Sequence, residues 1–275
     1  MKQPAFIHRS AAALRYAIAL SAAATYLLSA CPPTWADNAD SGIPAAKQEQ
    51  LFHDAARAYD QGQFGQATSL YRQLISSGHV SEEALFNLGN SLFRGGQIGQ
   101  AVLNYRRAQY LDPRDPDILA NLRFALQTTG AAPPQYGSLM TMLLRFSRAE
   151  WVVAATTAYW LAAVCVALIL ILRSGFRDML GRWLVLLGVL LVIALSGIAA
   201  WAQLGRRPEL VVIKPQQQAL FAPLEQNATP HFALAEGSIV RAVEFSGSWV
   251  KIVSGDREGW IKLDVCEPVC ISSGS

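Results

Sequence analysis

The sequence predicts a multidomain membrane protein in which an all-α repeat domain, two membrane-spanning helices and a small all-β domain follow one another. Three observations predict it: a helical pattern occurs twice before residue 130, two long apolar stretches lie between residues 151 and 204, and short β-rich stretches follow up to residue 270. Hydrophobic residues make up 52% of the 275-residue chain and charged residues only 16%. This composition is too apolar for a purely soluble protein, which supports the membrane assignment.

Residues 1–36 are expected to form an export signal. Lys2, Arg9 and Arg15 precede the apolar run "YAIALSAAATYLLSA", two prolines follow, and "TWA" offers small residues for cleavage after Ala36. The competing interpretation is "LSAC", which ends at Cys31 and is similar to the box before a lipid-modified cysteine. The proline break favours cleavage after Ala36, and it would place the region that follows outside the cytoplasm.

Residues 47–129 are expected to form a helical repeat domain. "GQFGQATSLYR" begins at residue 62 and "GQIGQAVLNYR" at residue 96, 34 residues later. A 34-residue period of paired helices is typical of the tetratricopeptide repeat, with helices at about 47–61, 64–77, 81–94, 98–111 and 115–128. The glycines of "LFRGGQIGQA" could instead suggest a phosphate-binding loop, but no strand precedes them and no Lys-Ser/Thr follows. We therefore interpret them as turn and packing residues.

Such stacks bind peptides in a groove lined by the first helix of each pair, and here that groove is expected to be aromatic and amide-rich. The candidate groove residues are Phe52, Tyr59, Phe86, Asn87, Asn90, Phe93, Asn121 and Phe124. Aromatic residues at helical spacing also serve to pack helices together, so each is a candidate for the core as well as for peptide contact. A clamp for a C-terminal carboxylate is disfavoured, because Asp117 stands where a basic residue would be expected.

After a linker and juxtamembrane segment, 130–150, residues 151–172 and 183–204 are each long enough to cross the hydrocarbon core as a helix. Neither contains Asp, Glu, Lys, Arg or His, which disfavours a channel or transporter role. The connector 173–182 carries Arg173, Arg177 and Arg182 and is expected in the cytoplasm by the positive-inside bias. With the export signal, this bias predicts an inner-membrane protein with both soluble portions in the periplasm.

Residues 208–270 are expected to form a small β-barrel that resembles bacterial SH3-like domains. The resemblance is carried by "EGSIVRAVEFSGSWVKIVSGDREGWIKLD", in which a short turn joins strands that contain Gly-Trp-Ile, and residues 215–235 fit a protruding loop. Trp249 and Trp260 are either core residues, which their size favours, or part of a peptide-binding surface. Cys266 and Cys270 flank Pro268 and are a candidate disulfide in an oxidising compartment, provided that the chain turns at the proline.

Motifs for chemistry are not evident in the sequence. The four histidines are scattered, and there is no HExxH, CxxC, G-x-S-x-G or P-loop motif. The net charge of +3 is not concentrated on a basic face, which argues against nucleic-acid binding. We therefore expect a non-enzymatic protein without a cofactor or metal.

The order of segments, from export signal through tetratricopeptide pair and membrane hairpin to SH3-like end, resembles the aerotolerance-operon protein family known as BatE. The strongest motif is "EEALFNLGNSLFRGGQIGQAVLNYRRAQYLDPRD", whereas the first copy departs from the pattern at Asp54 and Ala55. The resemblance implies a scaffold or adaptor beside membrane proteins with von Willebrand A domains and, indirectly, a MoxR-type ATPase. The alternative function is an anchor that binds peptidoglycan through the SH3-like domain.

Overall fold

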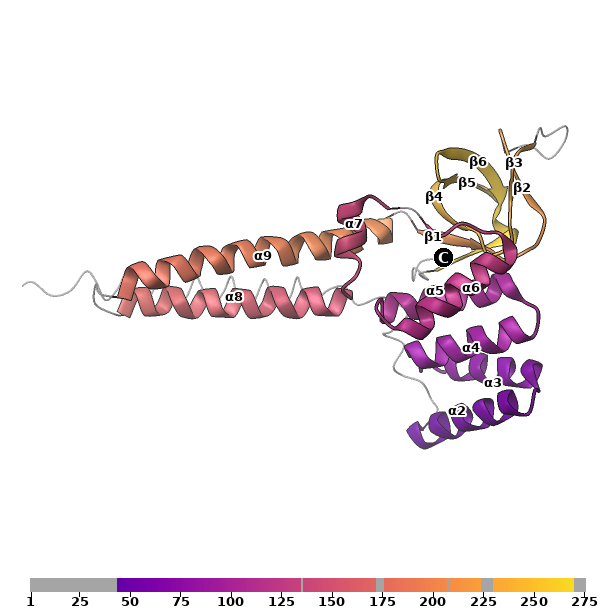
Figure 1. Ribbon diagram of the computed structural model, residues 1–275, viewed down its shortest axis with the longest axis horizontal. Helices are drawn as coiled ribbons and strands as arrows, with labels where there is room; N and C mark the ends of the chain where they lie inside the picture. Colours follow the sequence, from indigo (N-terminus) through magenta and orange to yellow (C-terminus); the bar gives the residue numbers. More distant parts are fainter. Residues whose placement is uncertain (1–43, 135, 172–175, 207, 224–229, 270–275) are drawn as a thin grey trace, which may run out of the picture. The chain divides into compact units, whose positions relative to one another are not determined.

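The computed structural model describes residues 44–134, 136–171, 176–206, 208–223 and 230–269, and the chain divides into two compact units (Figure 1). One unit includes residues 148–201, and the other combines 33–147 with 202–275. The second unit contains the helical region and an antiparallel sheet, so it is built from two stretches of chain that flank the first. The predicted export segment, 1–36, lies outside the described residues.

Five helices form the helical region, and their bounds agree with the expected ranges to within a few residues. They are α2 (Ala45–Asp60), α3 (Phe64–Ser76), α4 (Glu82–Arg94), α5 (Ile98–Leu111) and α6 (Pro116–Thr129). Side chains at the ends fix two of them: Ser81 accepts a hydrogen bond from the third residue of α4, and Asp115 accepts two from the start of α6. Gly130 then ends α6 in the left-handed conformation, at φ 72°.

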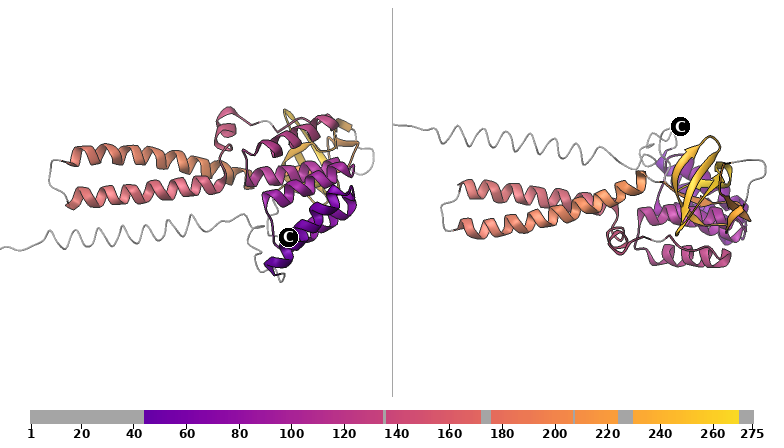
Figure 2. Two further views of the ribbon diagram at one scale, coloured as in Figure 1. Left: turned by 60° about the horizontal axis from the view of Figure 1, so that its bottom comes forward. Right: turned by 90° about the horizontal axis from the view of Figure 1, so that it is seen from above.

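Each copy of the 34-residue pattern is a packed helix pair, α2 with α3 and α4 with α5 (Figures 1 and 2). Gly62 and Gly96 make the turns between the paired helices at φ 73° and 79°, a conformation that favours glycine. Gly89 has a different role, since a Cβ at this position would lie 2.6 Å from the ring of Tyr105. The turn role predicted for Gly96 is therefore confirmed, and the structure adds an equivalent turn at Gly62 and a packing role for Gly89.

The segment predicted as linker and juxtamembrane region, 130–150, contains one short helix, α7 (Ser138–Leu143). No residue of α7 is buried. The next helix begins at Arg148, so the two helices are separated by only residues 144–147.

The other unit is a pair of apolar helices, α8 (Arg148–Ile171) and α9 (Arg177–Arg206), which lie side by side in all views (Figures 1 and 2). Both are long and apolar enough to cross a membrane, and many of their large apolar side chains are exposed. Gly197 of α9 lies against the indole of Trp151 in α8, where a Cβ would overlap the ring. The connector is shorter than the predicted 173–182, because α9 begins at Arg177.

Seven strands of the described residues form one antiparallel sheet in the order β3-β2-β6-β5-β4-β1-β7. The strands are β1 (Glu209–Val212), β2 (Gln217–Leu220), β3 (Pro230–Leu234), β4 (Ile239–Ser246), β5 (Trp249–Ser254), β6 (Arg257–Lys262) and β7 (Cys266–Pro268). The short turns at Gly247 and Gly255 have φ near +60°, as tight hairpins between twisted strands require. A cluster of buried residues that includes Val250, Ile252 and Ile261 fills one side of the sheet.

The sequence-based prediction was wrong for the segment 215–235, which we expected to be a protruding loop. It contains β2 and β3, which pair with each other, and β2 also pairs with β6 at Trp260. The strands are only four and five residues long, and "QQAL" and "PHFAL" do not show a regular apolar alternation. Pairing within the sheet, which a local pattern does not reveal, therefore determines their conformation.

The helical region and the sheet share a hydrophobic core. One cluster of buried residues contains side chains of α2 to α6 together with Val211, Ile239 and Val269 from the sheet. Val211 is fully buried and Val269 is 3% exposed. The two soluble portions, predicted as separate domains, are thus parts of one compact unit.

Candidate functional site

The predicted groove residues lie on the first helix of each pair and on α6. Phe52 and Tyr59 are on α2, Phe86, Asn87, Asn90 and Phe93 are on α4, and Asn121 and Phe124 are on α6. Seven of the eight are partly buried, and Phe124 is the exception at 59% exposed. The structure therefore places the set along three helices, with most members packed against the core and one ring facing solvent.

Aromatic contacts repeat with the sequence pattern. Phe52 contacts Tyr71 with ring centroids 5.8 Å apart, and Phe86, its equivalent 34 residues later, contacts Tyr105 at 5.9 Å. These two phenylalanines are thus primarily packing residues. Further along α4, Phe93 contacts Phe124 of α6 at 5.5 Å, which makes an aromatic surface that bridges two helices.

Asn90 is the centre of a hydrogen-bond network among α4, α5 and α6. Its Oδ1 accepts a bond from the Tyr105 hydroxyl at 2.8 Å and another from Asn121 Nδ2 at 2.8 Å. Burial raises the pKa of Tyr105 far above its ordinary value, so the phenol remains a donor. Two of the three predicted groove amides are therefore bonded to each other, and Tyr105 is a member of the site that the groove assignment omitted. Tyr105 could have been identified from the sequence, because the equivalent position of the first copy also holds a tyrosine, Tyr71.

A second group of polar contacts, which we name the Arg106 junction, joins α5 to the first strand of the sheet. Arg106 Nε donates to Glu209 Oε2 at 2.9 Å, and its Nη2 donates to Oε1 at 3.0 Å. The side chains are 9% and 1% exposed. A two-point guanidinium–carboxylate bond of this kind fixes orientation as well as distance.

Arg106 also contacts the segment that follows α6. Its Nη2 donates to the hydroxyl of Tyr136 at 2.7 Å, and its Nη1 donates to Gln109 Oε1 at 2.5 Å. The guanidinium lies over the ring of Tyr110, 5.1 Å from its centroid. The junction therefore holds together three parts of the chain: α5, the linker before α7, and β1.

Three residues of α5, Gly99, Gln100 and Arg107, make four further hydrogen bonds with the sheet and its loops. The backbone N–H of Gly99 donates to Glu236 Oε1 at 2.6 Å, which places a carboxylate at the positive end of the helix. Gln100 donates to Glu267, and Arg107 donates to the backbone carbonyls of Pro268 and Val269. The glycine-rich turn does meet an anion, but that anion is a side chain of the protein itself.

The two aromatic residues of interest in the sheet share one face. Trp249 pairs with Lys262 and Trp260 with Lys251, whereas the intervening pair, Val250 and Ile261, belongs to the buried cluster. Because side chains alternate along a strand, both tryptophans point away from that cluster. Trp260 is half-buried, while Trp249 is 8% exposed and lies under the ammonium of Lys262, 5.5 Å from the ring.

Cys266 is buried among the core residues of the sheet. Its Sγ lies 3.6 Å from the carbonyl oxygen of Leu263 and 3.8 Å from that of Lys262. Burial raises the pKa of its thiol to about 11. Cys270 lies outside the described residues, so the disulfide remains a prediction.

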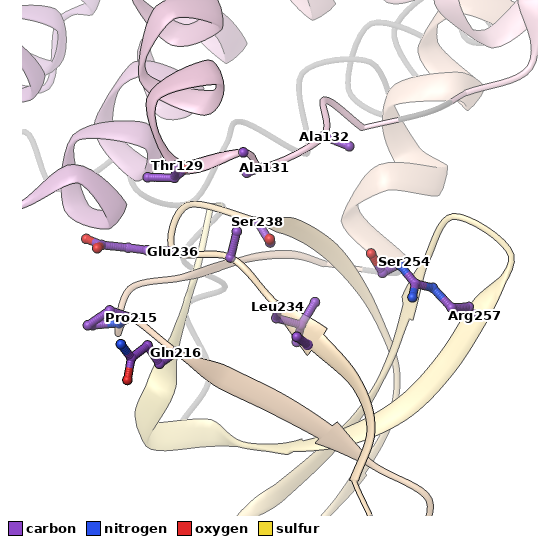
Figure 3. Close-up of a pocket in the computed structure, with 13 residues that line it drawn as sticks. Thr129, Ala131, Ala132, Pro215, Gln216, Leu234, Glu236, Ser238, Ser254 and Arg257 are labelled. Atoms are coloured by element: carbon purple, nitrogen blue, oxygen red, sulfur yellow. The ribbon is translucent and has the colours of Figure 1, made fainter.

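A pocket of about 600 Å³ lies between the end of α6 and the sheet (Figure 3). Leu234 is near its middle, with Ser254 and Arg257 on one side and Gln216 and Glu236 on the other. Arg257 lies over the Phe232 ring at 4.7 Å, and Glu236 is already bonded to Gly99. Throughout the described ranges, no three His, Cys, Asp or Glu side chains gather as a metal ion would require.

The chain matches no protein-family model, no curated protein and no solved structure.

Proposed function

We propose that the protein is a non-catalytic membrane scaffold whose helical region is a tetratricopeptide stack that binds a partner protein. Support for the stack comes from the equivalent contacts at the 34-residue spacing: Phe52 on Tyr71 and Phe86 on Tyr105. The turns at Gly62 and Gly96 are equivalent as well. The sheet, with its short hairpins and its buried side, is proposed to be an SH3-like barrel.

One observation carries the binding proposal, namely the exposure of Phe124 beside Phe93. A phenylalanine that is 59% exposed does little for the core, yet it extends a partly buried ring on the neighbouring helix. Exposed aromatic residues next to packed ones are typical of sites where a few side chains provide most of the binding energy. Asn90 and Asn121, each three residues before one of these phenylalanines, hold α4 and α6 together next to this surface, which keeps it preorganised.

The partner and location follow from the resemblance to the BatE family. It indicates a membrane protein with a von Willebrand A domain, an indirect link to a MoxR-type ATPase, and a role in envelope stress or aerotolerance. A shared core requires both soluble portions to lie on one side if α8 and α9 span the membrane. The export signal and the arginines of the connector favour the periplasmic side of the inner membrane.

Partner recovery from gently solubilised membranes tests the proposal. We expect the intact chain to co-purify a protein with an A domain, and Phe124→Ala to lower its recovery about tenfold or more. Phe245→Ala is the matched control, because Phe245 is also exposed, at 55%, but lies on β4. Recovery of no A-domain protein would reject this partner, and equal losses in both variants would reject the Phe124 surface.

The alternative function, peptidoglycan binding, is favoured by the position of Trp260. It lies half-buried on the face of the sheet that points away from the core, beside Lys251. Aromatic rings in such positions stack on apolar faces of ligands. If this function is correct, purified cell wall will sediment the full-length protein in detergent, and Trp260→Ala will reduce the bound fraction while Phe124→Ala will not. The full chain is required because Val211 and Ile239 belong to the core shared with the helices.

A further inference from the structure

The segment between α6 and α8 has an apolar surface that the helical region and the sheet leave exposed. Leu139 is 71% exposed, Met142 is 64% exposed and Phe146 is 39% exposed. Leu139 and Met142 are three residues apart on α7 and therefore share one face of the helix. Three large apolar side chains within eight residues are unusual for a surface in contact only with water.

The chain itself brings this surface close to the bilayer if α8 spans it. α7 ends at Leu143 and α8 begins at Arg148, so five residues at about 3.5 Å each give a reach of at most about 17 Å. The hydrocarbon core is about 30 Å thick within a bilayer of about 40–45 Å, so the polar interface lies within that reach. α7 can therefore contact the interface from where it is tethered.

The residues that flank α7 are mainly basic. The sequence contains no acidic residue between Asp117 and Glu150, which lies in the first turn of α8, whereas Arg145 follows α7 and Arg148 begins α8. The guanidinium of Arg114 lies over the ring of Phe146, 5.2 Å from its centroid, and adds another positive charge next to the apolar surface. Basic residues beside exposed apolar side chains complement anionic lipid headgroups.

We propose that α7 is an interfacial helix that binds the surface of an anionic bilayer, with Leu139, Met142 and Phe146 in the outer acyl region and Arg145 among the headgroups. The inference rests on the proposed membrane insertion of α8 and α9. The soluble unit then has two attachments to the bilayer. One is the tether to α8 and α9, and the other is the contact of α7 with the lipid surface. This contact restricts how the Phe124 surface is presented to a partner in the same membrane.

Depth-dependent fluorescence quenching tests the proposal in the full-length protein. An environment-sensitive fluorescent amino acid is placed singly at Leu139, Met142, Val164 or Phe245, and the protein is reconstituted into phosphatidylglycerol-containing vesicles with spin-labelled lipid. We expect quenching at Leu139 and Met142 to be at least about threefold stronger than at Phe245, which is an exposed aromatic position on the sheet. Arg145→Glu is expected to weaken the quenching at Met142.

The position at Val164, within α8, distinguishes a failure of the interfacial-helix proposal from a failure of the membrane insertion of α8 and α9. Strong quenching there with weak quenching at Leu139 and Met142, no greater than at Phe245, would overturn the interfacial helix and leave the membrane spans intact. Weak quenching at Val164 would overturn membrane insertion itself, and with it this inference. Quenching at Met142 that Arg145→Glu does not change would overturn the role of anionic headgroups.

Discussion

Arg72 and Arg106 occupy the same position in the two copies of the 34-residue pattern, yet only Arg106 is buried. Arg72 is exposed on α3, whereas Arg106 forms the two-point bond with Glu209 on β1. The sequence could not distinguish them, because the partner of Arg106 lies about a hundred residues further along the chain. A local pattern identifies the helix and the face of each arginine, but it contains no information on what that face meets.

We predict that Arg106→Ala lowers the free energy of unfolding of the detergent-solubilised protein by about 3–5 kcal/mol. The physical reason is that the carboxylate of Glu209 would remain buried without its partner. Arg72→Ala is the control and should change stability by no more than about 0.5 kcal/mol. Chemical denaturation followed by tryptophan fluorescence measures both.

The double variant Arg106→Ala with Glu209→Gln provides the decisive comparison. Because both single changes break the same contact, their combined effect should be smaller than the sum of the two. Additive losses, or a loss for Arg72→Ala as large as for Arg106→Ala, would contradict a stabilising role for the junction.

Tyr71 gives a prediction for alkaline pH. Burial, followed by the charges of Glu83 and Asp60, raises its pKa from 10.0 to about 12. The folded state therefore favours the neutral phenol, so this contribution to stability is complete below pH 10 and is lost as the pH rises from about 10 to 12. We expect the unfolding midpoint of the wild type to fall more steeply across this interval than that of Tyr71→Phe. Parallel curves would show that Tyr71 does not ionise in this way.

At the scale of elements, the approach of α5 to the sheet depends on Gly99. A Cβ at this position would lie 2.8 Å from Ile213 Cα and 2.9 Å from the carbonyl oxygen of Val212, both of which are backbone atoms. At Gly65, the equivalent residue of α3, nothing lies within 4 Å of the added Cβ. Two glycines that look identical in the sequence thus face a close contact in one case and open space in the other.

We predict that Gly99→Ala destabilises the protein by about 1–3 kcal/mol, since the backbone of the sheet must move to accommodate the methyl group. Gly65→Ala should be neutral or should stabilise it by up to about 1 kcal/mol, because alanine restricts the unfolded chain. Thermal unfolding of the two variants under the same conditions makes the comparison. A destabilisation by Gly65→Ala equal to that of Gly99→Ala would show that the close contact with the sheet does not limit stability.

The helices were predictable from the sequence, and three of the strands were not. The 34-residue repeat placed five helices to within a few residues, and the caps at Ser81 and Asp115 and the stop at Gly130 that the structure shows are local features as well. In contrast, β2, β3 and β7 are three to five residues long and are defined by their pairing. The same division applies to the site: the aromatic positions could be assigned from the repeat, but the Tyr105–Asn90–Asn121 network and the Arg106 junction required the fold.

At the scale of the whole molecule, a core shared between residues that precede α8 and residues that follow α9 limits the possible topologies. Val211, Ile239 and Val269 are buried together with side chains of the helical region, so these parts fold together. An even number of membrane crossings between them is then required. Between these two parts, the described residues contain two helices that could span a membrane, α8 and α9, and this number meets the requirement.

Cysteine accessibility in intact spheroplasts tests this topology. We predict that Gln63→Cys, in the turn before α3, and Asp256→Cys, in the β5–β6 turn, both react with a membrane-impermeant maleimide added from outside. Met179→Cys, near the start of α9, should react only after the membrane is permeabilised, because the arginine-bearing connector is expected in the cytoplasm. Positions 63 and 256 on opposite sides would contradict a shared core, whereas both on the inside would contradict export while leaving the shared core intact. In all three variants the native cysteines, Cys31, Cys165, Cys266 and Cys270, are replaced by alanine, so that labelling reports only the side of the membrane on which the introduced thiol lies.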